Sequence, residues 1–203
     1  MRVEEAKVGA RGFDSYPFST AKTVASYQAK KLSLAGLEFF VGYLGAVDAP
    51  KLKAMLASGL AFMPVTFAGA YNGAQTVAQC EALGIPAGCT VWLDLEGTQD
   101  PMVADKINAW ADTVKAAGYE PGLYVGSPQP FTDHELYKLH VVRYWKAPSR
   151  IVDRNGAWGS GPDCGFCCLQ LWPSLTWRDT GVLLDVDVIQ QDHLGRLPHW
   201  VVY

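Results

Sequence analysis

The most informative stretch of the sequence is Val91-Trp92-Leu93-Asp94-Leu95-Glu96-Gly97, a short apolar run that carries two carboxylates. An apolar run of this length bounded by glycine is typical of a buried strand. Side chains two residues apart on a strand point to the same face, so Asp94 and Glu96 should project side by side from its C-terminal end. Two carboxylates forced together on an apolar strand repel each other, and one should keep its proton at neutral pH. Such a pair is suited to general acid catalysis.

Strand and helix signals alternate around this stretch through the first two-thirds of the chain. The expected strands there are residues 11–14, 37–43, 61–67, 90–95 and 122–126. The expected helices are residues 19–33, 49–58, 73–83 and 101–117. Ser19 or Thr20 should cap the N-terminus of the first helix. The next three helices should end at Gly59, Gly84 and Gly118. After residue 126 the pattern predicts at most a short helix over 131–138, followed by three strands over 139–146, 167–172 and 182–189 that are joined by loops.

This order of elements favours a closed barrel. Repeated strand–helix units imply parallel strands with right-handed crossovers. A full eight-stranded barrel typically takes about 250 residues, and this chain of 203 residues saves length by omitting the late helices. The prediction is an α/β protein with an abbreviated TIM-type (β/α) barrel, about five βα units followed by three strands with few helices, in one domain over 1–203 with its core at about 10–192. An open doubly wound sheet is disfavoured because no G-x-G-x-x-G follows the first strand and no P-loop occurs.

Composition and charge exclude several function classes. A net charge of −3 and a pI near 5.8 do not indicate the basic surface that nucleic-acid-binding proteins carry. No apolar run is long enough to span a membrane. Residues 1–12 contain no apolar segment after their charges, so no secretory signal is predicted. We expect a protein made in the cytoplasm that stays in the cell or leaves by another route, such as release by lysis or incorporation in a virion.

The five cysteines leave their chemistry open. Cys164-Gly165-Phe166-Cys167 has the C-x-x-C form, which suits zinc, redox chemistry or a disulfide. Zinc usually takes four ligands, and no second pair of ligands lies nearby in the sequence. We therefore expect no metal and no cofactor, and the alternatives for these residues are free thiols or a disulfide that staples a loop. The odd count leaves at least one thiol unpaired within the chain.

Acidic residues gather at the expected strand ends, where parallel barrels carry their functional groups. Asp14 ends the first strand, Asp94 and Glu96 end the fourth, and Asp185 and Asp187 lie two residues apart in the eighth. A structural role is the alternative for each, because Asp14 also precedes a turn sequence and the last two can bind backbone amides. The pair on the fourth strand is harder to explain structurally. Burying an unpaired charge costs about several kcal/mol, and that strand contains no Lys or Arg.

Aromatic residues cluster at the same strand ends, with one glutamine nearby. They are Tyr43, Phe67, Tyr124, Trp145 and Trp172, and the glutamine is Gln170. Aromatic side chains also simply fill cores, since they bury a large area anywhere. A ring of Tyr and Trp around acids nevertheless suits a sugar, because it offers apolar faces for stacking and polar tips for hydroxyl groups.

Taken in order, these motifs resemble a known family. They are Gly12-Phe13-Asp14, Trp92-Leu93-Asp94-Leu95-Glu96, Gly122-Leu123-Tyr124, Tyr144-Trp145-Lys146-Ala147, Gln170-Leu171-Trp172 and Leu184-Asp185-Val186-Asp187-Val188. Over residues 10 to 192 the chain resembles the glycoside-hydrolase-like domain related to the family 25 lysozymes (muramidases). The resemblance implies a barrel of five strand–helix units followed by three plainer strands. It also implies cleavage of the β-1,4 bond between N-acetylmuramic acid and N-acetylglucosamine in peptidoglycan.

The resemblance also assigns roles by position. Glu96 would be the general acid that protonates the leaving oxygen, and Asp94 its charged neighbour that keeps this acid protonated and steadies positive charge at the sugar. Asp14 and one of Asp185 or Asp187 would line the opposite wall. The family motif on the eighth strand is V-D-x-N, so Asp185 matches the acid, while Asp187 falls where Asn is usual.

The chain also departs from the lysozymes in its seventh-strand motif, and this departure bears on whether it is active. The lysozymes read W-Q-Y on the seventh strand, whereas this chain reads Leu169-Gln170-Leu171-Trp172, which matches the glycoside-hydrolase-like branch better. Activity does not follow from membership of that branch. The first hypothesis is therefore a lysozyme-like hydrolase, phage-encoded as an endolysin or virion component. The second is a non-catalytic carbohydrate-binding or structural barrel, and the third, a metal-dependent hydrolase using Asp14, Asp94 and Asp187, ranks lower because no His is near.

The sequence does not decide between the possible mechanisms or identify the partners. Carboxyl groups about 5 to 5.5 Å apart favour a retaining route and about 6.5 to 9.5 Å an inverting one, and the substrate acetamido group is a third candidate nucleophile. Residues 197–203 are apolar for a chain end. They either pack against the bottom of the barrel or dock a partner such as a virion protein.

Overall fold

The structure is a computed structural model that describes residues 1–15, 32–33, 35–67, 71–96, 100–149, 151–153, 155–177 and 182–203. The helix expected over 19–33 lies outside the described residues except for its last positions, Leu32 and Ser33, which are helical.

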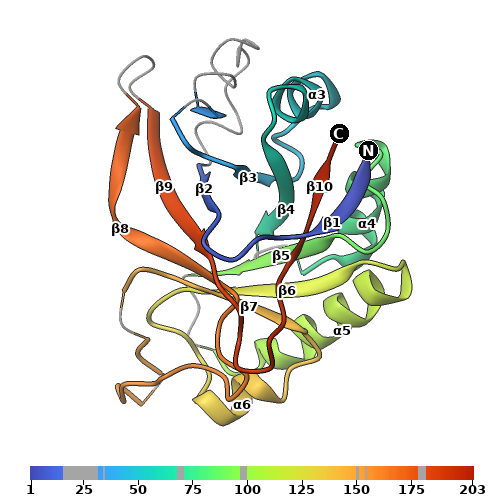
Figure 1. Ribbon diagram of the computed structural model, residues 1–203. Coiled ribbons are helices and arrows are strands. Elements are labelled where there is room, and N and C mark those ends of the chain that lie inside the picture. Colours follow the sequence, from blue (N-terminus) through green and yellow to red (C-terminus); the bar gives the residue numbers. More distant parts are fainter. Residues whose placement is uncertain are drawn as a thin grey trace.

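Eight strands form a closed barrel, which confirms the expected fold class (Figure 1). They are β2 (Arg11–Asp14), β3 (Phe39–Tyr43), β4 (Ala61–Phe67), β5 (Thr90–Leu95), β6 (Glu120–Val125), β7 (Arg143–Lys146), β8 (Cys168–Trp177) and β9 (Val182–Ile189). The order around the barrel is β4-β3-β2-β9-β8-β7-β6-β5, and the pairing of β4 with β5 closes it. The strand ends that carry the acidic residues therefore meet around one opening.

One strand departs from the parallel arrangement. β9 runs antiparallel to both of its neighbours, β2 and β8, while the other barrel strands pair in parallel. Only residues 178–181 separate β8 from β9. A parallel connection needs a crossover of about a dozen residues or more, so this short link forces a reversal of direction.

Four helices are described on the outside of the barrel, α3 (Ala49–Ala57), α4 (Gly73–Ala82), α5 (Val103–Ala116) and α6 (Asp133–Tyr137). Asp48 caps α3 by accepting from the Lys51 backbone N–H at 2.8 Å. The three expected glycine stops have φ of +92° (Gly59), +69° (Gly84) and +88° (Gly118), a left-handed conformation that glycine adopts at low cost. The short α6 and the absence of a described helix between β7 and β8 agree with the expected loss of late helices.

The chain ends add two strands that the sequence patterns did not predict. β1 (Arg2–Glu5) pairs antiparallel with β10 (His199–Val202), and β10 also pairs with β4 through Val201 and Phe62. Figure 1 shows both termini lying side by side next to β4 and α3. Trp200 and Val201 are buried. The apolar end of the chain is therefore packed within the molecule, as the first of its two alternatives supposed.

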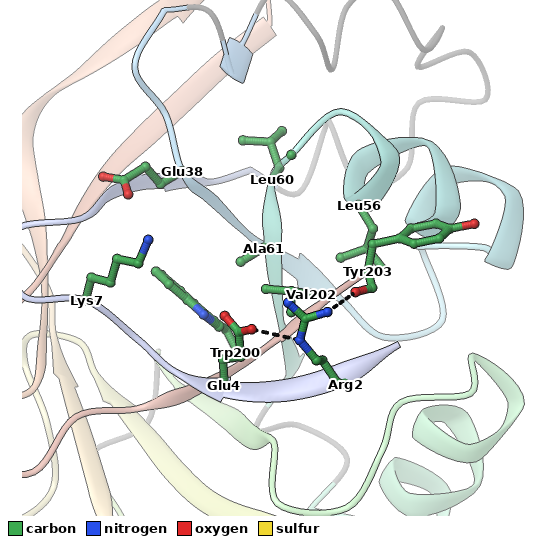
Figure 2. Close-up of a pocket in the computed structure, with 11 residues that line it drawn as sticks. Arg2, Glu4, Lys7, Glu38, Leu56, Leu60, Ala61, Trp200, Val202 and Tyr203 are labelled. Atoms are coloured by element: carbon green, nitrogen blue, oxygen red, sulfur yellow. Dashed lines mark hydrogen bonds and ion pairs between the residues drawn. The ribbon is translucent and has the colours of Figure 1, made fainter.

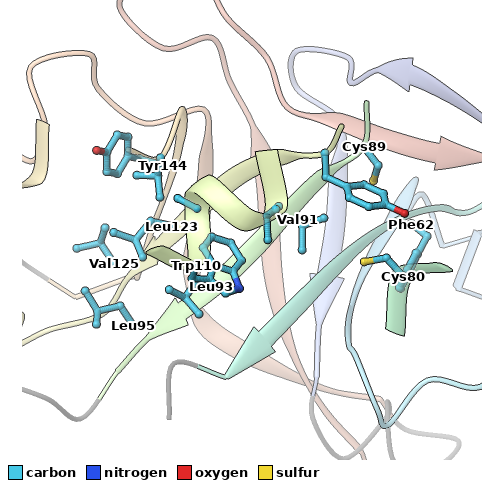
Figure 3. Packing of buried hydrophobic residues seen from close by; sticks show 14 of the residues in the cluster. Phe62, Cys80, Cys89, Val91, Leu93, Leu95, Trp110, Leu123, Val125 and Tyr144 are labelled. Atoms are coloured by element: carbon cyan, nitrogen blue, oxygen red, sulfur yellow. The ribbon is translucent and has the colours of Figure 1, made fainter. Parts of the chain in front are cut away.

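Successive side chains on each strand point alternately toward the helices and into the barrel, so the hydrophobic core has two parts. On β5, Val91, Leu93 and Leu95 face the helices and pack near Trp110 of α5 (Figure 3). Trp92 belongs to the second cluster, which fills the barrel interior. Because Asp94 follows Trp92 by two residues, its side chain is directed to the interior as well.

The interior is crowded with aromatic rings, and glycine makes room for them. A Cβ atom on Gly12 would collide with the ring of Phe39, and one on Gly122 would collide with the indole of Trp92. Trp200 from β10 lies against Phe39, with ring centroids 5.7 Å apart. The interior of the barrel at the end where the parallel strands begin is thus filled by these aromatic side chains.

All five cysteines are buried free thiols, so the disulfide alternative is not realised. Within the described ranges, no group of three or more His, Cys, Asp or Glu side chains could hold a metal ion. None of the helices described is both long and apolar enough to cross a bilayer.

Candidate active site

A cavity of about 80 Å³ opens at the carboxyl ends of the parallel strands. It is lined by Asp14, Tyr43, Asp94, Glu96, Tyr124, Trp145, Gln170 and Asp185. Four of these side chains are carboxyls, and none of the described lining residues is a lysine or an arginine. The strand period therefore brings together, in one cavity, most of the residues that the sequence singled out.

Asp94 is the buried member of the carboxyl pair. Its side chain is on β5 and the residue is 5% exposed, whereas Glu96 follows the end of β5 and is exposed. The Tyr43 hydroxyl donates to Asp94 Oδ2 at 3.1 Å, and Asp94 Oδ1 has no partner among the described residues. Burial, with the nearby charge of Glu96, raises the pKa of Asp94 to about 7.

This geometry changes one expectation. The resemblance made Asp94 the charged neighbour of a protonated Glu96. The structure buries Asp94 and leaves Glu96 exposed, so Asp94 is the carboxyl whose pKa burial raises. The cause is depth, because Glu96 comes after the last residue of the strand and reaches solvent.

Asp14 is joined to the far wall of the cavity by a chain of hydrogen bonds. Gln170 Nε2 on β8 donates to Asp14 Oδ2 at 3.2 Å, and the Tyr124 hydroxyl on β6 donates to Gln170 Oε1 at 2.6 Å. Burial, and then the charges of Asp185 and Asp94, raises the pKa of Asp14 well above its usual range. Gln170 is therefore held by Asp14 and Tyr124 in the empty cavity.

Asp185 and Asp187 take different positions. Asp185 pairs with Asp14 across β2 and β9, lines the cavity and accepts a short hydrogen bond from the Ser174 hydroxyl. Asp187 is fully buried and does not line the cavity. Because β9 is antiparallel, its earlier residue lies nearer the opening, which is why Asp185 is the residue that faces the site. Nothing in the sequence marked Ser174, which lies in the irregular segment of β8 between Leu171 and Leu175.

The expected aromatic residues divide into two groups. Tyr43, Tyr124 and Trp145 line the cavity. Phe67 is 48% exposed and stacks on Tyr43 with ring centroids 4.5 Å apart, so it lies beside the cavity rather than in it. Trp172 is 80% exposed and does not line the cavity. The pairing of β8 with β9 shifts register just after Leu171, which breaks the alternation on which the placement of Trp172 depended.

A larger hollow of about 280 Å³ lies at the other end of the barrel, between the terminal strands and the loop before β4 (Figure 2). Its charged groups include an ion pair, since Arg2 Nε donates to Glu4 Oε1 at 2.8 Å, and Arg2 also donates to the Tyr203 backbone carbonyl at 3.1 Å. Its described lining contains two carboxyls, Glu4 and Glu38, together with the cations Arg2 and Lys7. The smaller acidic cavity is the one whose chemistry matches general acid catalysis.

Comparison with known proteins identifies the family. A family model described as the Rv2525c-like, glycoside hydrolase-like domain matches residues 13–179. The chain belongs to this family. A search of curated protein sequences found no match.

Solved structures share the fold of this glycoside hydrolase-like chain. An uncharacterized protein of B. stearothermophilus is 18% identical, with a TM-score of 0.67 over 90% of this chain and 96% of that one. A glycosyl hydrolase 25 of Streptococcus pneumoniae, a virulence factor, is 12% identical, with a TM-score of 0.60 over 89% and 87%. The catalytic domain of an endolysin from bacteriophage P40 of Listeria monocytogenes is 14% identical, with a TM-score of 0.55 over 91% and 95%. At these identities the likeness establishes the barrel fold.

Proposed function

We propose that this chain is a glycoside hydrolase of the lysozyme (N-acetylmuramidase) type that cleaves the glycan strands of bacterial peptidoglycan. One observation carries the proposal: a buried carboxyl with a pKa of about 7, Asp94, lies beside an exposed carboxyl, Glu96, in a cavity at the functional end of the barrel. The family and the endolysin domain of the same fold support the choice of glycan as substrate. Release by lysis or as part of a virion fits the same proposal.

Glu96 is the proposed general acid because it is the carboxyl of the pair that a glycosidic oxygen can reach. Asp94, with its pKa of about 7, retains a proton at acidic pH. A bound sugar brings its glycosidic oxygen to the exposed Glu96 carboxyl. The proton passes through Glu96 to the leaving oxygen, and Asp94, then charged, stabilises the positive charge that develops on the sugar ring.

The opposite wall supplies the remaining groups. Asp14 and Asp185 face the pair across the cavity and are placed to activate water or to attack the sugar directly. Retaining, inverting and acetamido-assisted routes differ in the anomer that is released first, so NMR of the fresh product assigns the route. Tyr43, Tyr124 and Trp145 offer ring faces and hydroxyl groups to the sugar.

A second function is supported by the size of the cavity. At about 80 Å³ it is far smaller than the roughly 300–1,000 Å³ of typical ligand pockets. It admits the reacting part of a glycan rather than a whole sugar unit. The alternative proposal is therefore a non-catalytic carbohydrate-binding or structural barrel within a larger assembly such as a phage tail.

A peptidoglycan clearing assay separates the two functions. We expect the wild type to clear a suspension and Glu96→Gln to clear it about 10²–10⁴-fold more slowly, the usual contribution of a general acid. A pull-down with insoluble peptidoglycan should show equal binding by both proteins. Equal clearing by both would remove Glu96 from the chemistry. Binding without clearing by the wild type would favour the non-catalytic barrel.

A further inference from the structure

Asp187 is a fully buried carboxyl that the proposed reaction does not use. It lies on β9 opposite Gly12 of β2, one step deeper in the barrel than Asp185. The Trp145 indole N–H donates to Asp187 Oδ1 at 3.0 Å. No donor from the described residues reaches Asp187 Oδ2.

The surroundings of Asp187 disfavour a charge. The titratable groups that face it are Asp14 on β2, Asp185 on its own strand, Tyr124 on β6 and Cys168 on β8. Each of these is neutral or negative, and no described cation pairs with Asp187. An ionised carboxyl at this position would be a buried charge with one unsatisfied oxygen, an arrangement that proteins avoid.

The missing partner is supplied if Asp187 is itself a donor. Its carboxyl lies within hydrogen-bond range of the Asp14 carboxyl, and burial together with the charge of Asp14 raises the pKa of Asp187 well above its usual range. On Asp14 the same hydrogen bond lowers the pKa, but burial and the charges of Asp185 and Asp94 outweigh it and raise the Asp14 pKa. Asp14 also accepts from Gln170, so two donors converge on it.

We propose that Asp187 is a neutral carboxylic acid that donates its proton to Asp14 in a hydrogen bond, and that it is thereby a positioning residue which fixes the orientation of the Asp14 carboxyl toward the cavity. The role in positioning rests on the proposed function, because only there is Asp14 part of the chemistry. A protonated carboxyl offers one donor and one acceptor, as an amide does. Asparagine should therefore replace Asp187, while an apolar residue of similar volume should not.

Two variants test the role in the reaction. Asp187→Asn keeps the donor to Asp14 and the acceptor for Trp145, and we expect its glycan hydrolysis to stay within a few-fold of wild type. Asp187→Leu removes both, and we expect a loss on the order of tenfold to a hundredfold because Asp14 is no longer held in place. Equal losses in the two variants would overturn the proposal, since they would mean that a charge at residue 187 is required.

Infrared spectroscopy tests the protonation itself without any substrate. At a pH above the Asp94 value of about 7, the wild type should show the C=O stretch of a buried protonated carboxyl, and this band should be weaker in Asp187→Asn, where only the contribution of Asp14 remains. The matched control is Asp192→Asn, since Asp192 is also buried but is ion-paired with Arg196 at 2.7 Å. This variant should keep the band.

The hydrolysis assay and the infrared comparison test different parts of the proposal and can fail independently of each other. A band that is unchanged in Asp187→Asn would show that Asp187 is ionised and would overturn the proposal even if the enzyme is active. If the wild type hydrolyses no glycan, the proposed function fails, while the infrared comparison still decides the protonation of Asp187. If Asp187→Leu does not fold, Asp187→Asn and the infrared band carry the test.

Discussion

Asp94 is buried on β5 while Glu96 is exposed just beyond the end of that strand, and this burial raises the pKa of Asp94. The two-residue period of a strand was enough to predict that both face one cavity, and both line it. Depth could not be predicted, because the opening of the barrel depends on how eight strands close around it. The sequence therefore identified the pair but not which of its members is buried.

The burial of Asp94 predicts a pH dependence of stability. Its pKa is raised from 3.8 to about 7, so the folded chain keeps a proton that the unfolded chain has already lost. Stability should therefore fall as pH rises from about 4 to about 7, with about 4 kcal/mol of the decrease due to this group. Asp14 and Asp187 shift in the same direction, so the test is a difference. Urea unfolding should give a shallower decrease in Asp94→Asn than in wild type, and identical slopes would contradict the assignment.

Tyr43 tunes the same carboxyl. Its hydroxyl donates to Asp94, and this hydrogen bond lowers the Asp94 pKa against the effect of burial. Tyr43→Phe should raise that pKa further and move the alkaline limb of the pH–rate profile upward. It should also lower the free energy of unfolding at alkaline pH by about 1–3 kcal/mol, since the carboxylate loses its donor. Tyr137→Phe, a change on the surface, is the control; equal profiles for both variants would exclude the role of Tyr43.

At the level of elements, the hairpin of β8 and β9 decides where Asp185, Asp187 and Trp172 lie relative to the cavity. The bounds of β9 were predicted correctly, but its direction follows from the length of the link to β8, and direction decides that Asp185 rather than Asp187 faces the cavity. The register shift within β8 moves Trp172 out of the expected alternation. Periodicity describes a regular strand and does not reveal such an irregularity.

The exposed position of Trp172 predicts that it can be removed at little cost. Trp172→Ala should change the free energy of unfolding by no more than about 0.5 kcal/mol and leave glycan hydrolysis near wild type. Trp145→Phe is the contrast, because it deletes the donor to buried Asp187 and should cost about 1–3 kcal/mol. Denaturant titration and the clearing assay measure both. A large loss of activity in Trp172→Ala would place this side chain back in the site.

For the whole molecule, the alternation of strand and helix signals was sufficient to predict the barrel and the loss of late helices. The same pattern did not predict the terminal strands β1 and β10. β1 consists of the charged sequence Arg2–Glu5, and β10 becomes a strand only by pairing with β1 and β4, a contact between the two ends of the chain. Such long-range pairing leaves no local pattern. The paired ends nevertheless fill the barrel opposite the cavity.

This arrangement predicts that a substitution of Trp200 lowers the stability of the fold without lowering the activity of the folded molecule. Trp200→Ala removes a buried indole that packs on Phe39 and should lower the free energy of unfolding by about 3–5 kcal/mol. Activity per folded molecule should be unchanged, because the cavity is at the other end. Tyr203→Ala, at an exposed position, should change neither. A loss of activity in Trp200→Ala beyond its loss of folded protein would contradict this separation.

In the proposed function, the acidic opening of the barrel cleaves the bond that follows N-acetylmuramic acid. Mass spectrometry of the soluble fragments released from purified peptidoglycan tests it most directly. Wild type should release fragments whose new reducing end is N-acetylmuramic acid, and Glu96→Gln under identical conditions should release almost none. New reducing ends on N-acetylglucosamine, or the same fragments from both proteins, would contradict the account.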